Sequence, residues 1–172
     1  MGLSNVRIGA CSVKFKTRDV GHTLEGLEFN FVRSFEDLKV DKYGDMPVDM
    51  ALTGHNLTIK FKMAEVTLAN LDVAIPEGGY QTAGQGTRIN LGTDAGYLLA
   101  QDAGELVLHP LKNAASDLTE DIVVYKAVSV EAVPLNYKVN EQRVVEVTMR
   151  ALVSEDYADG RRLGHIGVTN IS

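Results

Sequence analysis

The chain has 172 residues, of which 45% are apolar and 23% charged, and its formal net charge is −6. This composition excludes a largely disordered chain, and the length fits one domain. Net acidity disfavours a clamp for nucleic-acid phosphates, and the single cysteine, Cys11, excludes an intrachain disulfide. The sequence has no run of 18 apolar residues and no secretory signal pattern at its start, so we expect neither a membrane span nor a leader.

The first half of the chain predicts two strands by alternation, after a first strand at 7–16. Residues 27–36 place Leu27, Phe29, Phe31 and Phe35 on one face and Glu28, Asn30, Ser34 and Glu36 on the other. Residues 55–63 alternate in the same way, which is typical of half-buried antiparallel strands. We therefore expect the two segments to pair as a hairpin.

The connection between these strands, at about 40–54, is longer than an ordinary hairpin loop. This connection is rich in turn-forming and charged residues. It also carries apolar residues, which favour docking against another surface. The members that we expect to make such contacts are Asp41, Tyr43, Met46 and Met50. The alternative is that this loop folds back on its own subunit.

One amphipathic helix is predicted over 63–75, where Pro76 ends it. Its apolar stripe consists of Ala64, Leu68, Leu71 and Ile75. Residues 77–87 contain four glycines and are interpreted as a flexible loop. Further strands are predicted at 97–100, 105–109, 122–130, 143–153 and 163–168. The expected fold is mainly β: a two-sheet β-sandwich or partial barrel with one flanking α-helix.

The residue patterns offer no constellation for catalysis or metal binding. The four histidines lack a ligand spacing, and the Asp41, Asp45, Asp49 run lacks the glycine position and terminal Glu of an EF-hand. Gly84-Gln-Gly-Thr87 is not a dinucleotide-binding fingerprint, and no G-x-S-x-G motif occurs. We expect a protein that is not an enzyme and that needs no cofactor.

The order of several weak motifs resembles the tail tube proteins, or major tail proteins, of long-tailed, non-contractile bacteriophages. The motifs are Gly21-x-Thr-x-x-Gly26, Lys39–Asp49, Ala64-Glu-Val-Thr-Leu-Ala-Asn-Leu71, Asp121–Ala127 and Val145–Leu152. Together they span nearly the whole chain. Leu24-Glu25 and the 77–91 loop depart from the family pattern.

The resemblance implies a single tail-tube domain over 1–172, with a fold that is also similar to the tube protein of type VI secretion. The assembly loop at about 40–54 is expected to stack rings by reaching the adjacent ring through Asp41, Tyr43, Met46 and Met50. Six copies would form a ring by strand pairing, and rings would stack into a hollow conduit in the virion after assembly in the bacterial host cytoplasm. The implied partners are other copies, the tape-measure protein, the tail terminator and tail-tip proteins. DNA would be in contact only in transit, and no membrane would be involved.

The conduit lining can be sought among the acidic strand residues. Residues 25–50 hold seven acids against three bases, a balance of −4. We expect the lumen to be lined by Glu28, Asn30, Ser34, Glu36, Glu146 and Thr148, with some acids paired across strands. The alternatives are that these faces are simply solvated, and that the chain is a capsid or decoration protein or a β-barrel ligand-binding module.

Overall fold

The computed structural model describes residues 9–84, 86–92, 95–131, 133–135 and 137–168. Ten strands and one α-helix are found in this part of the chain, together with three short 3-10 turns at 41–43, 76–78 and 99–101. The strands and helix, in chain order, are β1 (Cys11–Phe15), β2 (Arg18–Asp19), β3 (Thr23–Lys39), β4 (Pro47–Met63), α1 (Leu68–Ala74), β5 (Tyr80–Ala83), β6 (Gly86–Ile89), β7 (Gly104–Pro110), β8 (Ile122–Ser129), β9 (Val145–Ala151) and β10 (Gly164–Ile166).

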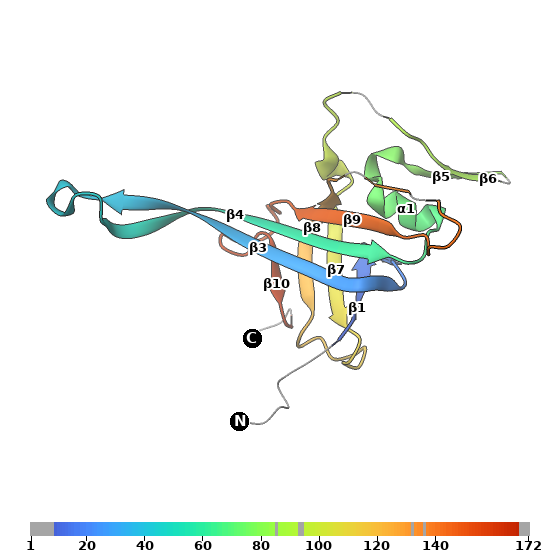
Figure 1. Ribbon diagram of the computed structural model, residues 1–172, viewed down its shortest axis with the longest axis horizontal. Helices are drawn as coiled ribbons and strands as arrows, with labels where there is room; N and C mark the ends of the chain where they lie inside the picture. Colours follow the sequence, from blue (N-terminus) through green and yellow to red (C-terminus); the bar gives the residue numbers. More distant parts are fainter. Residues whose placement is uncertain (1–8, 85, 93–94, 132, 136, 169–172) are drawn as a thin grey trace.

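The expected fold class is confirmed, because the protein is mainly β with one helix. The large antiparallel sheet has the order β2-β1-β7-β8-β9-β4-β3, and β10 pairs with β8. β5 and β6 make a separate two-stranded sheet. β1 and β3 also contact each other although most of the sheet separates them in strand order, so the sheet curls into a partial barrel (Figure 1).

The core fills the inside of this curled sheet. The alternation of β4 directs Leu57, Ile59, Phe61 and Met63 inward, and each is at most 4% exposed. On β9, Met149, Val147 and Val145 stand opposite the last three of these residues and are equally buried. Strands β1, β7 and β8 close the core with Val13, Phe15, Leu106, Leu108, Val124 and Ala127.

The helix is shorter than the apolar pattern of the sequence predicts, and the residues on its buried face differ from the predicted stripe. Met63 is the last residue of β4, and α1 begins at Leu68 because the Thr67 side chain accepts a hydrogen bond from Asn70 N–H at 3.1 Å. The predicted stripe is therefore wrong in part. Leu71 is buried and Ile75 is partly buried against the core, whereas Leu68 is 43% exposed and Ala64 precedes the helix.

The buried face of α1 instead includes a polar residue, Asn70. Its side-chain amide donates to the carbonyl oxygens of Val20 at 3.0 Å and Glu65 at 2.9 Å. The Glu65 carboxylate accepts from His22 N–H at 3.2 Å and packs so closely on Gly21 that a Cβ there would lie 2.6 Å from Glu65. The Ala64–Leu71 motif thus joins α1 to the turn before β3, which gives it a structural role.

Two other expectations are corrected by the fold. Residues 80–89 contain the β5–β6 hairpin, so most of the predicted 77–87 loop is a strand pair or its turn. Residues 97–100 are not a strand; a 3-10 turn covers 99–101 before β7 begins. The glycines and short polar residues of 77–87 show no alternation, whereas 97–100 is a short apolar run, Tyr-Leu-Leu-Ala, which does not by itself distinguish a strand from a turn.

The position of α1 yields a paired prediction on stability. Leu71→Asp should lower the free energy of unfolding by about 3 kcal/mol or more, because it buries a carboxylate in the apolar core. Leu68→Asp is the matched control, and it should change stability by only about 0.5 kcal/mol because Leu68 is 43% exposed. Urea unfolding followed by circular dichroism measures both. Equal destabilisation by the two substitutions would contradict this placement of the helix.

Candidate assembly interface

The most prominent feature of the molecule is a long arm made of the outer parts of β3 and β4. The two strands pair from Thr23↔Met63 to Lys39↔Pro47, but only Thr58–Met63 of β4 also pair with β9. Beyond that point the hairpin leaves the body as a two-stranded ribbon (Figure 1). We define the arm as residues 31–56, with its tip at 40–50.

The local sequence explains how the arm is built. Val40 C=O accepts from Tyr43 N–H at 3.0 Å, and Asp41 C=O accepts from Gly44 N–H at 3.3 Å, which forms a tight 3-10 turn. Gly44 has a φ of +62°, a left-handed conformation that glycine adopts without strain. Pro47 is the first residue of β4, a strand position that needs no N–H donor to the ladder.

These observations correct the predicted loop at 40–54. Residues 47–54 belong to β4, and the connection is 40–46 only. The alternative in which this segment folds back on its own subunit is wrong, because the arm points away from the body (Figure 1). The predicted contact residues Asp41, Tyr43, Met46 and Met50 all lie in the tip, and all are exposed.

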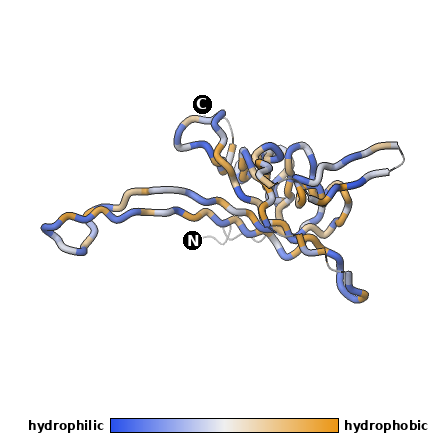
Figure 2. The backbone as a smooth tube through the Cα atoms, turned by 90° about the horizontal axis from the view of Figure 1, so that it is seen from above, coloured by the Kyte–Doolittle hydropathy of each residue, from blue (hydrophilic) through white to orange (hydrophobic). Residues whose placement is uncertain are grey.

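Large apolar side chains are exposed along the whole arm. They recur between polar residues out to the tip (Figure 2), and each is 44–64% exposed. The residues are Phe31, Val32, Phe35, Leu38, Val40, Tyr43, Met46, Val48, Met50 and Leu52. On one face they continue the core side of β3 and β4, since Phe31 pairs with the buried Leu57 and Phe35 with Leu52. Val32 and Leu38 instead share the other face of β3 with Ser34 and Glu36, so apolar side chains are exposed on both faces of the arm. Exposed apolar surface of this extent is typical of a surface that another molecule covers.

The backbone of the arm is also incompletely paired. Within the described residues β3 has no partner strand besides β4, and residues 47–57 of β4 have no partner besides β3. Unpaired strand edges are templates for pairing with another chain, and an isolated two-stranded hairpin is only marginally stable in water. The arm therefore has both the apolar surface and the backbone groups of an interface between chains.

The predicted lining residues lie mostly together on the other face of the hairpin. Glu28, Asn30, Ser34 and Glu36 are all exposed, and their cross-strand partners on β4 are Lys60, Thr58, Gly54 and Ala51. Glu146 is exposed on β9 next to Lys62. Five of the six predicted lining residues therefore lie on one polar surface, which spans β3, β4 and β9.

Thr148 is the exception, because it is 3% exposed. The chain after β8 continues along β9, where Val130 N–H donates to Thr148 C=O at 3.0 Å. The Thr148 hydroxyl then donates to the Glu131 carboxylate at 2.7 Å, so Glu131 covers it. The alternation of β9 gave the correct face for Thr148, but it could not reveal the segment that lies over it.

Near the body the charges of this polar surface are paired. Lys62 forms an ion pair with Glu25, which raises the pKa of the lysine, and Lys60 lies 4.0 Å from Glu131. Further out, Glu36 stands opposite Ala51 and has no ion-pair partner within the described chain. The pairing agrees with the expectation that some acids are balanced across strands.

The described residues contain no candidate metal cluster and one free cysteine, Cys11. No cluster of three or more His, Cys, Asp or Glu side chains there could hold a metal ion. Burial raises the pKa of the Cys11 thiol, which reduces its reactive thiolate fraction. None of the helices in the described ranges is long and apolar enough to cross a membrane.

No protein-family model matches the chain, and no curated protein matches it significantly.

Amide hydrogen exchange should separate the arm from the body in the unassembled chain. We expect amides of 31–39 and 47–56 to exchange on the order of a hundredfold faster than those of β8 and β9, because no core supports the ribbon. The arm should become protected when copies associate. Equal protection of arm and body at high dilution would show that the arm needs no partner.

Proposed function

We propose that this chain is the structural subunit of a bacteriophage tail tube, in which copies form rings that stack into a hollow conduit. The observation that supports it most is the arm, whose unpaired strand edges and exposed apolar residues are typical of a surface that pairs with other chains. The sequence resemblance to tail tube proteins of long-tailed, non-contractile phages supplies the kind of assembly. The role is structural, without catalysis.

Ring formation would use the free edges of the arm. The outer edge of β3 in one copy can pair with the free edge of β4, residues 47–57, in the next copy. Repeating this contact around a ring closes the hairpins into one barrel, which removes every exposed edge. A ring of six is what the resemblance implies.

The two faces of the hairpin then acquire different environments. The apolar face turns toward the bodies of the copies, while the polar face with Glu28, Asn30, Ser34 and Glu36 lines the conduit. DNA carries roughly one charge per 1.7 Å of its axis, so a basic lining would retain it. A lining that is paired near the body and mildly acidic further out would let DNA pass.

The further partners follow from this role. The conduit would hold the tape-measure protein before DNA enters, and its ends would contact tail terminator and tail-tip proteins. The assembled tube would belong to the virion, and its subunits would assemble in the bacterial host cytoplasm.

An apolar groove of about 500 Å³ beside the root of the arm supports a second candidate, a β-barrel ligand-binding module. A capsid or decoration protein is a third structural alternative. Negative-stain electron microscopy of the purified chain distinguishes the three, because they give tubes or rings, monomers and shells. Monomers alone at high concentration would overturn the tube proposal.

Shortening the arm tests its role in assembly. Glu36 and Ala51 are cross-strand partners, so replacing residues 37–50 with Asn-Gly closes a shorter hairpin on an existing pair. We expect a folded chain with an unfolding temperature within about 3 °C of wild type, because no core residue is removed. Size-exclusion chromatography and electron microscopy should show no rings or tubes.

A matched pair of variants removes side chains only. Met46→Ser with Met50→Ser replaces arm residues that are 64% and 60% exposed. Leu98→Ser with Leu111→Ser replaces body residues that are 67% and 61% exposed. Assembly should be lost in the arm variant and kept in the body variant. Loss of assembly in both would mean that general surface hydrophobicity, not the arm, drives association.

The lining assignment predicts a gain of DNA binding. Ser34→Lys with Glu36→Lys adds positive charge opposite Gly54 and Ala51, where no lysine stands across the strand. Tubes of this variant should retain duplex DNA at low salt and release it as screening increases, while wild-type tubes do not retain it. Ser116→Lys with Glu155→Lys, at exposed positions of the body, adds the same charge of +3 and is the control for net charge. If variant tubes do not retain DNA at low salt, this face lies outside the conduit.

A further inference from the structure

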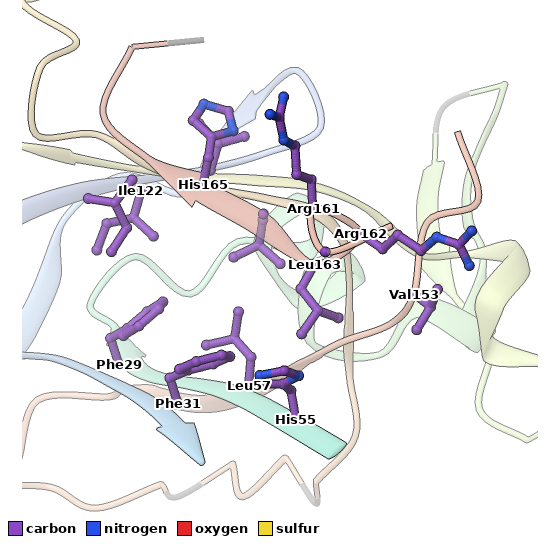
Figure 3. Close-up of a pocket in the computed structure, with 15 residues that line it drawn as sticks. Phe29, Phe31, His55, Leu57, Ile122, Val153, Arg161, Arg162, Leu163 and His165 are labelled. Atoms are coloured by element: carbon purple, nitrogen blue, oxygen red, sulfur yellow. The ribbon is translucent and has the colours of Figure 1, made fainter. Parts of the chain in front are cut away.

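The groove at the root of the arm is built from segments that are far apart in the sequence. One wall comes from the hairpin, with Phe29 and Phe31 of β3 and Leu57 of β4. The opposite wall comes from Ile122 at the start of β8 and from Leu163 in the segment that leads into β10 (Figure 3). The groove is mainly apolar, and Phe31 remains 47% exposed within it.

The rim of the groove carries positive charge. Arg161 and Arg162 both line it (Figure 3), and Arg162 is held by Asp159 at 2.5 Å. Arg161 is exposed and makes no ion pair among the described residues. None of the described residues that line the groove is acidic. Its occupant should therefore be an apolar segment that carries negative charge.

The tip of the arm has this chemistry. Tyr43, Met46, Val48 and Met50 are 48–64% exposed there. Between residues 36 and 50 the hairpin has five acids, Glu36, Asp37, Asp41, Asp45 and Asp49, against Lys39 and Lys42. Of these acids only Asp45 is paired, with Lys39 at 3.5 Å, and it is fully exposed.

The tip cannot enter the groove of its own chain. Leu57 lies in the groove and Met46 at the tip, and a strand rises about 3.3 Å per residue, so roughly 35 Å separates them along the arm. Continuous pairing keeps the ribbon extended over this distance (Figure 1). An occupant from the tip must come from another copy.

We propose that the groove lined by Phe29, Phe31, Leu57 and Leu163 is the docking site for the arm tip of a second copy of this chain. Met46 and Met50 fill the apolar part of the groove, and Arg161 faces the acidic residues of the tip. This inference rests on the proposed self-assembly and adds the receptor site for the arm. A volume of about 500 Å³ suits several large side chains.

Two symmetries satisfy this contact. If each copy is shifted along the arm relative to the last, the tip of one reaches the groove of the next, and the chain of contacts stays open at its ends. If two copies face each other, each tip enters the partner's groove and assembly stops at a closed dimer. The proposed tube requires the first arrangement, whereas docking itself is compatible with both.

Cross-linking between two single-cysteine variants tests the docking directly. In a Cys11→Ser background that still assembles, Met46→Cys marks the tip of one protein and Ile166→Cys marks the groove of another, which carries a mass tag. Ile166 lines the groove and is 68% exposed. Leu98→Cys is the control for the second protein, because Leu98 is 67% exposed and lies outside the groove. A short bis-maleimide should give about tenfold more mixed product with Ile166→Cys than with Leu98→Cys.

The outcomes of this experiment distinguish the docking proposal from the tube proposal. Preferential cross-linking within tubes supports both, and preferential cross-linking in a species no larger than a dimer supports docking and overturns the tube. Tubes without preferential cross-linking overturn the docking site alone. No assembly and no cross-link overturns both.

A charge variant provides a second readout. Arg161→Glu should weaken association roughly tenfold at low salt, because it places an acid beside the acidic tip. Arg161→Lys should keep most of the association, and Lys112→Glu should leave it unchanged. The effect should shrink as salt is added. An Arg161→Glu variant that associates like wild type would show that the tip does not meet this rim.

Discussion

The pairing of β3 with β4 is the interaction on which the rest of the structure depends. Near Met63 the hairpin supplies one side of the core, and the same ladder continues past the last contact with β9 to the tip. The same face of β3 and β4 passes from complete burial at Ile59 to about half exposure at Phe35 and Leu52, across one bulge between Ser34 and Phe35. The body stabilises the root, and the outer arm lacks any such support within its own chain.

Much of the fold could be predicted from the sequence, because burial on one side of a sheet imposes alternation. The segments 27–36 and 55–63 were recognised as partners, and the mainly β class with one helix is confirmed. The predicted helix begins too early in the chain, because Met63 and Ala64 extend an apolar pattern that belongs to the end of β4. Only the contact of Thr67 with Asn70 N–H marks the first turn, and a side-chain cap leaves little trace in apolar periodicity.

The sequence predicts which residues belong to the candidate interface better than it predicts how they are arranged in space. The apolar content of 40–54 indicates a docking segment. The strand within it is not predicted, because Pro47 and Gly54 belong to residue types that are usually depleted in strands. Thr148 shows a different limit, because the alternation of β9 cannot reveal that Glu131 lies over it. The groove was not foreseen at all. Its walls come from residues near 30, 57, 122 and 163, and no local pattern connects them.

The irregularity in the ladder between Ser34 and Phe35, where Thr53 is skipped, has a consequence for growth of the proposed assembly. A bulge bends its strand and increases the local twist, so the apolar sides of the inner and outer arm face different directions. In the proposed assembly, one neighbour would cover the inner part of the arm and a different neighbour would cover the outer part. A copy that adds to an incomplete ring gains only one of these contacts. Elongation under this arrangement is cooperative, with a slow first ring and fast addition afterwards, and isolated subunits remain unassembled at low concentration.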